Sequence, residues 1–174
     1  ALMLSISCEH PDLEEFISIK NDLNSVTKAN ISVKVTDDFM KAVVDEEYYD
    51  LTFIRPETNE EIIKRVFAPD IFKQLCENNW NYAEPGILYW DNIQKFNLLQ
   101  YDDNFEYAGV NPCAEEPLPA GGSCLLGSLN LAAFVDEDEW GPKFAFEDFE
   151  DAVELAVVAL NDVLDEGLPL HPLE

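Results

Sequence analysis

Short runs in which hydrophobic and polar residues alternate mark several expected strands along the chain. Residues 31–35 alternate strictly, because three β-branched residues share one side while a serine and a lysine share the other. A period of two is typical of a strand with one buried face. Residues 2–7 alternate more loosely, and residues 49–54 and 87–90 are short apolar runs close to prolines or glycines, so we expect strands there as well.

Hydrophobic residues at helical spacing occupy the intervals between these strands. A stripe of this kind follows Pro11, which suits the first turn of a helix. Thr36 precedes two aspartates and another stripe, so we expect it to cap a second helix. We expect a helical region over residues 59–79, kinked or split at Pro69. Residues 146–164 give the clearest helical pattern.

The order of these elements favours an α/β fold, because expected strands alternate with expected helices. No single period dominates residues 92–109, which stay unassigned. The chain has 174 residues, of which 47% are hydrophobic and 11% aromatic, enough to build a packed core. It begins with an alanine and has no basic leader, so we expect a piece taken from inside a longer chain.

The charge of the chain changes which partners are expected. Lys and Arg number 10 against 36 Asp and Glu, which gives a net charge of −26. Such a surface repels nucleic acids and anionic membranes, and we expect neither as a partner. The two arginines, Arg55 and Arg65, lie outside any glycine-rich loop, so we expect phosphate binding to come from other segments. Three origins of the charge remain open: a solvated acidic face, a salt-adapted host, or missing basic segments that pack here.

The four cysteines are Cys8, Cys76, Cys113 and Cys124, and no two form a C-x-x-C pair. A structural zinc site is therefore not expected. No apolar run approaches the length needed to span a bilayer, and no secretory signal is recognisable. A reducing, cytoplasmic setting is the resulting expectation.

The segment from residue 111 to residue 131 carries the candidate chemistry. It contains Asn-Pro-Cys-Ala-Glu-Glu-Pro-Leu at 111–118 and Gly-Gly-Ser-Cys-Leu-Leu-Gly-Ser-Leu-Asn-Leu at 121–131. If the first part is extended, Asn111, Cys113 and Glu115 point the same way. A thiol, an amide and a potential base on one small ligand would make a reactive site. Spacing alone supports this weakly, because a lone cysteine in a loop is usually structural.

These two stretches resemble the active-site loop of the large, catalytic subunit of ribonucleotide reductases. The resemblance is closest to the adenosylcobalamin-dependent class II enzymes and their near relatives in class I. Four further blocks resemble stretches of that family in the same order. They lie at residues 10–17, 29–37, 84–88 and 160–165. The resemblance implies that residues 1–174 are the central segment of the catalytic barrel domain. This would be part of a ten-stranded α/β barrel, with a central finger loop at about 108–124.

Roles for individual residues follow from the resemblance. Cys113 would form a thiyl radical that abstracts the 3′-hydrogen of the substrate ribose. Glu115 would accept the proton of the 3′-hydroxyl, and Asn111 would hold the ribose hydroxyls. Cys124 would be one of two cysteines that reduce the substrate and become a disulfide. Its partner in the family lies in an early Ser-Ser-Cys strand, which this sequence lacks.

The remaining cysteines and one departure from the family pattern carry further expectations. Cys8 is expected to be a small buried hydrophobe, and Cys76 to be structural. The family usually has glycine where Ala114 stands. If that position needs a positive φ, alanine strains the loop by about 1–2 kcal/mol.

The resemblance also implies partners. A class II enzyme would use adenosylcobalamin, whereas a class I enzyme would receive its radical from a separate small subunit, with no cofactor on this segment. Other expected partners are the remaining segments of the catalytic chain, a ribonucleotide, a thioredoxin-like reductant and, when complete, a second copy in a homodimer. The segment is not expected to be active alone. A non-catalytic assembly module that keeps the fold is the alternative from another class.

Overall fold

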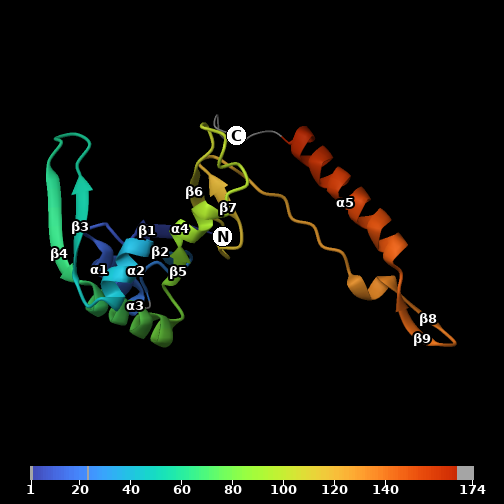
Figure 1. Cartoon of the computed structure of the whole chain (residues 1–174), viewed down its shortest axis with the longest axis horizontal. Coiled ribbons are helices and arrows are strands. Elements are labelled where there is room, and N and C mark those ends of the chain that lie inside the picture. Colours follow the sequence, from blue (N-terminus) through green and yellow to red (C-terminus); the bar gives the residue numbers. More distant parts are fainter. Residues whose placement is uncertain (1, 23, 168–174) are drawn as a thin grey trace. The chain divides into compact units, whose positions relative to one another are not determined.

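The computed structural model describes residues 2–22 and 24–167, and the chain divides into two compact units (Figure 1). Unit 1 ends at Ala120 and unit 2 begins at Gly121. Unit 1 is built on a three-stranded parallel sheet in the order β1-β2-β5. Its strands are β1 (Met3–Ser7), β2 (Asn30–Val35) and β5 (Gly86–Tyr89). The strands predicted at 2–7, 31–35 and 87–90 are thereby confirmed.

The apolar side of β2 packs into the core of unit 1. Helices α1 (Leu13–Ser18), α2 (Asp37–Val44) and α3 (Ala68–Tyr82) contribute to the same core. The cap predicted for α2 is confirmed, because Thr36 Oγ1 accepts a hydrogen bond from the Phe39 amide at 3.2 Å. The core cluster consists of Cys8, Leu13, Ile17, Val33, Val35, Phe39, Ala42, Leu51, Val66, Ala68, Ile71 and Leu75.

An antiparallel ribbon extends from this core (Figure 1). It is formed by β3 (Tyr48–Ile54), which the sequence predicted, and β4 (Glu61–Phe67). The helical region predicted over residues 59–79 is therefore wrong over β4. Its β-branched residues pair across the ribbon, and Val66 is buried against the core. Pro69 falls in the first turn of α3, where its missing N–H needs no partner.

The spacing of hydrophobic residues predicted no element over residues 92–109, where the structure has most of one helix and most of one strand. Helix α4 (Trp90–Lys95) follows β5, and a short ladder forms between β6 (Tyr107–Val110) and β7 (Pro117–Pro119). Asp37 joins α4 to α2: its amide donates to Asp91 at 2.6 Å, and its carboxylate pairs with Lys95 at 2.7 Å. The β6–β7 hairpin is therefore the element that carries the candidate loop.

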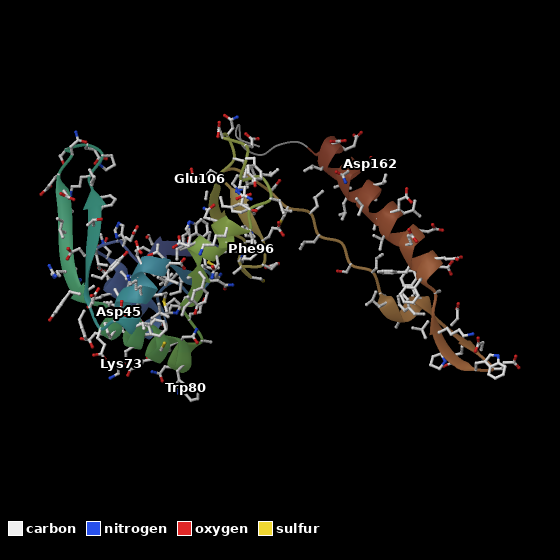
Figure 2. All side chains as sticks on the ribbon, in the orientation of Figure 1. Asp45, Lys73, Trp80, Phe96, Glu106 and Asp162 are labelled. Carbon is white, nitrogen blue, oxygen red and sulfur yellow. The ribbon has the colours of Figure 1, made fainter. Side chains whose placement is uncertain are left out.

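Unit 2 confirms the clearest helical prediction. Helix α5 spans Phe146–Glu166, after a 3-10 turn η2 (Leu131–Phe134) and a hairpin of β8 (Val135–Asp138) and β9 (Gly141–Phe144). That hairpin was not predicted, since four consecutive acids at residues 136–139 interrupt the alternation. The rings of Phe134, Phe144 and Phe149 pack together at its base. No residue of α5 is buried, and its side chains project on all sides (Figure 2).

The mixed α/β content confirms the predicted fold class only in part. The described residues form one three-stranded and three two-stranded sheets, and these sheets do not close into a barrel. The ten-stranded barrel and the assignment of the chain to one domain segment stay predictions. None of the helices in residues 2–22 and 24–167 has the length and hydrophobicity of a transmembrane helix.

Tyr49 links the core to a prediction about alkaline pH. Its hydroxyl donates to Glu9 Oε1 at 3.3 Å, and burial raises the pKa of Tyr49 to about 12. An unfolded tyrosine ionises near pH 10, so above that pH the unfolded chain holds fewer protons than the folded one. The stability contributed by this proton is present below pH 10 and is lost as the pH rises towards 12.

Replacing Tyr49 with phenylalanine should therefore flatten the alkaline fall in stability. We expect the free energy of unfolding of the complete protein to fall less steeply between pH 10 and 12 in Tyr49→Phe than in the parent, in urea titrations at several pH values. Tyr48→Phe, at an exposed position of the same strand, is the matched control and should follow the parent. Parallel pH curves for the parent and Tyr49→Phe would contradict the argument.

Candidate active site

The candidate loop closes the β6–β7 hairpin and is held by its own hydrogen bonds. Val110 pairs with Pro117, so residues 111–116 form the connection. The Asn111 amide donates to the Glu116 carbonyl at 3.1 Å, and the Glu116 amide donates back to Asn111 Oδ1 at 3.0 Å. The Ala114 amide donates to the Asn111 carbonyl at 2.9 Å. Asn111 therefore organises the loop, and Cys113 lies at its turn.

The loop is not extended, which corrects the geometry expected from the sequence. Pro112 and Cys113 occupy a turn, and a bend follows at residues 114–115. The Oδ1 atom of Asn111 is engaged within the loop, and the side chains of Cys113 and Glu115 are exposed. Asn111, Cys113 and Glu115 thus share one short loop without projecting from one side of a strand. Their catalytic roles stay predictions.

Ala114 has a φ of +67°, in the left-handed region. The structure therefore has the positive φ on which the strain expected at Ala114 depends. An L-residue with a side chain pays about 1–2 kcal/mol there, whereas glycine does not. The strain falls on the residue directly after Cys113, so it bears on the conformation of the loop turn.

Substituting Ala114 with glycine should stabilise the loop. Relief of the left-handed strain exceeds the extra backbone entropy of glycine, which leaves a net gain of about 1 kcal/mol. We expect hydrogen exchange of the bonded loop amides in the complete protein to slow by roughly fivefold. Ala120→Gly is the matched control, because φ is not positive at that position, and it should give no slowing. Unchanged or faster exchange in Ala114→Gly would contradict the strain argument.

A hollow of about 510 Å³ lies beside the loop turn, within unit 1. Its wall combines the first residues of three parallel strands, the end of α3 with the turn after it, and the loop itself. The lining residues are Met3, Asn30, Ile31, Ser32, Tyr82, Ala83, Glu84, Gly86, Pro112, Cys113 and Ala114. Parallel strands begin at the same edge of a sheet, which explains how segments far apart in sequence meet here.

Two features keep the strand side of the hollow closely packed. A Cβ added to Gly86 would lie 2.8 Å from Ser32 Oγ, so a side chain at this position would require the Ser32 hydroxyl to turn away. Glu84 Oε1 accepts from the Ile31 amide at 3.0 Å, and the other carboxylate oxygen pairs with Lys20. The polar groups at this edge are therefore bound to one another, which fixes the wall that Cys113 faces.

Two residues of β2 contact the hairpin directly. Asn30 Nδ2 donates to the Pro112 carbonyl at 2.6 Å, and Lys34 Nζ donates to the Ala108 carbonyl at 2.5 Å. Sequence reasoning assigned neither residue to the site. The available signal was the polar side of the alternating strand at residues 30–34, which faces away from the apolar side.

The other cysteines have different surroundings. Cys8 is buried in the core, as predicted, with Sγ 3.7 Å from Thr36 Oγ1. Burial raises the pKa of the Cys8 thiol, which keeps it protonated. Cys76 is exposed on α3 and does not line the hollow. Cys124 is an exposed residue of unit 2, so its predicted redox pairing stays a prediction.

The described residues hold no cluster of metal-ligating side chains. No group of three His, Cys, Asp or Glu in residues 2–22 and 24–167 could hold a metal ion. His10 accepts a hydrogen bond from the Asp12 amide at Nδ1 and packs against Phe53, with ring centroids 5.0 Å apart. It does not line the hollow. Among the residues that line the hollow, the only His, Cys, Asp or Glu are Glu84 and Cys113, and Glu84 is already bound to Lys20 and the Ile31 amide, so the lining does not form a metal-ligand set.

Cys113 carries a thiol on a strained hairpin turn and lines a hollow at the edge of a parallel sheet. These features define a candidate thiol-dependent active site in an α/β protein. Comparisons with known proteins identify the family. The family model described as the barrel domain of ribonucleotide reductase matches residues 1–173. The chain therefore belongs to the ribonucleotide reductase barrel-domain family.

Curated relatives support the same membership. A vitamin B12-dependent ribonucleoside-diphosphate reductase of Thermoplasma acidophilum is 37% identical over 161 residues, covering 92% of this chain and 20% of the relative. A vitamin B12-dependent ribonucleotide reductase of Streptomyces coelicolor is 34% identical, covering 92% and 19%. A vitamin B12-dependent ribonucleoside-diphosphate reductase of Mycobacterium tuberculosis is 31% identical, covering 95% of this chain and 23% of the relative. The chain thus spans about a fifth of the length of these relatives.

Proposed function

We propose that this chain is the radical-loop segment of a ribonucleotide reductase catalytic subunit. In the complete protein it would reduce ribonucleotides to deoxyribonucleotides through a thiyl radical at Cys113. One observation carries the proposal: Cys113 lies at the turn of an internally bonded loop and faces a hollow of about 510 Å³. Pockets of roughly 300–1,000 Å³ suit small-molecule ligands, and part of a nucleotide falls in this range.

Within this proposal, the loop residues act on the ribose. The Cys113 thiyl takes the 3′-hydrogen atom, and Glu115 accepts the proton of the 3′-hydroxyl while the 2′-hydroxyl leaves as water. Glu115 is exposed, so its carboxylate is accessible, and catalytic hydrogen bonds often tighten only when substrate binds. The Oδ1 atom of Asn111 organises the loop, which leaves Nδ2 as the donor towards a ribose hydroxyl.

The electrons of the reduction come from a pair of thiols. Cys124 and a cysteine outside these residues would form a disulfide, giving two electrons and two protons as the substrate loses its 2′-oxygen as water. A thioredoxin-like dithiol would then restore the pair by thiol–disulfide exchange. Cys8 is excluded from this role by its burial in the core, with a pKa that burial raises.

Adenosylcobalamin dependence is proposed for the complete protein, because the relatives cited above are named as vitamin B12-dependent. The proposed contribution of this segment is the Cys113 thiol, and no residue of the segment is assigned to the cofactor. A class I enzyme, with its radical supplied by a separate subunit, is the closest alternative. A non-catalytic assembly module is the alternative from a different class. The proposed setting is the cytoplasm, with the complete catalytic chain as a homodimer.

An assay of the complete protein separates these possibilities. Ribonucleoside diphosphates or triphosphates are supplied with a dithiol reductant and with either adenosylcobalamin or a radical-generating second subunit, and deoxyribonucleotides are measured. Product that requires adenosylcobalamin supports the proposal. Product that instead requires a second protein subunit supports the class I alternative. No product under either condition, from a folded protein that binds nucleotide, contradicts catalysis and favours the assembly module.

A further inference from the structure

Strand β2 has two chemically different sides. Val33 and Val35 belong to the apolar core cluster, and Ile31 is also buried. The alternate residues, Asn30 and Lys34, direct their side chains to the β6–β7 hairpin instead. Because residues two apart on a strand share a side, these two contacts come from the same side of β2. The core therefore fixes the strand that holds the loop.

The two contacts attach the hairpin at separate points. Asn30 bonds the Pro112 carbonyl and Lys34 bonds the Ala108 carbonyl, so the hairpin segment runs antiparallel to the strand. Asn30 and Lys34 lie four residue steps apart along the strand, roughly 13 Å at 3.3 Å per residue. A segment bonded at one point can pivot, whereas one bonded at two points has a fixed position and direction along the strand.

Lys34 is itself held in place. Its ammonium lies 4.0 Å from the centroid of the Trp90 ring, at the start of α4. A cation over the face of an aromatic ring is attracted by the ring quadrupole. Partial burial lowers the pKa of Lys34, and its Nζ remains a donor to a carbonyl in either protonation state. The far anchor of the hairpin is thus supported from a third element.

The near anchor acts directly on the residue that bears the candidate thiol. The Pro112 carbonyl belongs to the peptide plane that carries the Cys113 amide, so fixing this oxygen fixes the orientation of that plane. Pro112 adds its own restricted φ on the other side. We propose that Asn30 and Lys34 are positioning residues, which dock the hairpin on β2 and thereby set where the Cys113 thiol meets the ribose.

The inference rests on the proposed function for its catalytic part, and it has a structural part that can be measured alone. Misplacing a reacting group by about 1 Å can cost roughly 100-fold in rate without a change in ground-state binding. Loss of an anchor should therefore lower kcat and leave KM nearly unchanged. A purely structural role would instead affect stability, with the activity of the folded fraction preserved.

The test uses five variants of the complete protein. Asn30→Leu and Lys34→Met remove the donors at similar size, while Asn30→Gln and Lys34→Arg keep a donor. Lys28→Met is the matched control, because Lys28 is an exposed lysine close to β2 that does not line the hollow. Hydrogen exchange of the amides of residues 109–116 and the kinetics of ribonucleotide reduction are measured for each variant.

We expect Asn30→Leu and Lys34→Met to speed loop exchange by about tenfold or more. We expect them to lower kcat by roughly 10- to 100-fold, with KM within about twofold of the parent. Asn30→Gln and Lys34→Arg should recover most of both losses, and Lys28→Met should match the parent. Unchanged loop exchange in both donor-free variants overturns the inference. A kcat loss that the donor-keeping variants do not recover also overturns it.

Failure of the proposed function gives a different pattern. If the parent protein does not reduce ribonucleotides, the proposed function fails, and hydrogen exchange alone decides whether Asn30 and Lys34 anchor the loop. Faster exchange in the donor-free variants then supports the anchoring, and unchanged exchange overturns it.

Discussion

Cys113→Ser in the complete protein is expected to lower ribonucleotide reduction by at least about 10⁴-fold, the scale seen when a residue that forms a reactive intermediate is removed. Serine has nearly the size of cysteine, and Cys113 is exposed at the loop turn, so the hairpin should keep its conformation. The O–H bond of serine is far stronger than an S–H bond, so serine does not yield its hydrogen atom to a radical acceptor. The chemical step is lost while the hollow remains.

The measurement combines steady-state product formation with equilibrium binding of the ribonucleotide. Binding should stay within about twofold of the parent, because the loss lies in the transition state rather than in the ground state. Cys76→Ser is the matched control, since Cys76 is an exposed cysteine outside the residues that line the hollow. It should retain the activity of the parent. Activity of Cys113→Ser within tenfold of the parent would remove the thiyl assignment.

The spacing of hydrophobic residues and a helix-capping residue explain why much of unit 1 could be predicted from its sequence. The strict alternation at residues 31–35 and the cap at Thr36 each reflect a local rule, and the structure confirms both. Strand β4 was missed because its apolar residues are spaced ambiguously, and its pairing with β3 decides its state. The spacing of hydrophobic residues within one segment does not show which other strand that segment pairs with.

The residues of the candidate site could also be predicted only in part from the sequence. The motif at residues 111–118 pointed to the loop, and the family's usual glycine at Ala114 raised the question of a positive φ, which the structure answers with +67°. Asn30 and Lys34 lie about 80 residues before the loop, and their contacts depend on the hairpin meeting β2. Their alternation indicated a polar side of the strand but could not indicate what that side binds. Only the fold joins the two segments.

Phe39→Ala is expected to cost about 3–5 kcal/mol of stability in unit 1, the usual range for emptying a buried phenylalanine site. Phe39 is fully buried and meets the ring of Tyr49 edge to face, with centroids 5.4 Å apart. The loss removes both the transfer free energy and this aromatic contact. Hydrogen exchange of the β2 amides should become roughly 10²- to 10⁴-fold faster where it requires opening of the core. Val44→Ala, at a 77% exposed site of the same helix, should change exchange little.

The same variant tests how far the loop depends on the core. Val33 and Val35 pack in the core cluster with Phe39, and the opposite side of their strand holds the hairpin through Asn30 and Lys34. Loosening one side of β2 should therefore also speed exchange of the amides in residues 111–116. If β2 exchanges faster in Phe39→Ala while those loop amides keep the rate of the parent, the hairpin is held independently of the strand. If both change together, the core beneath β2 maintains the position of Cys113.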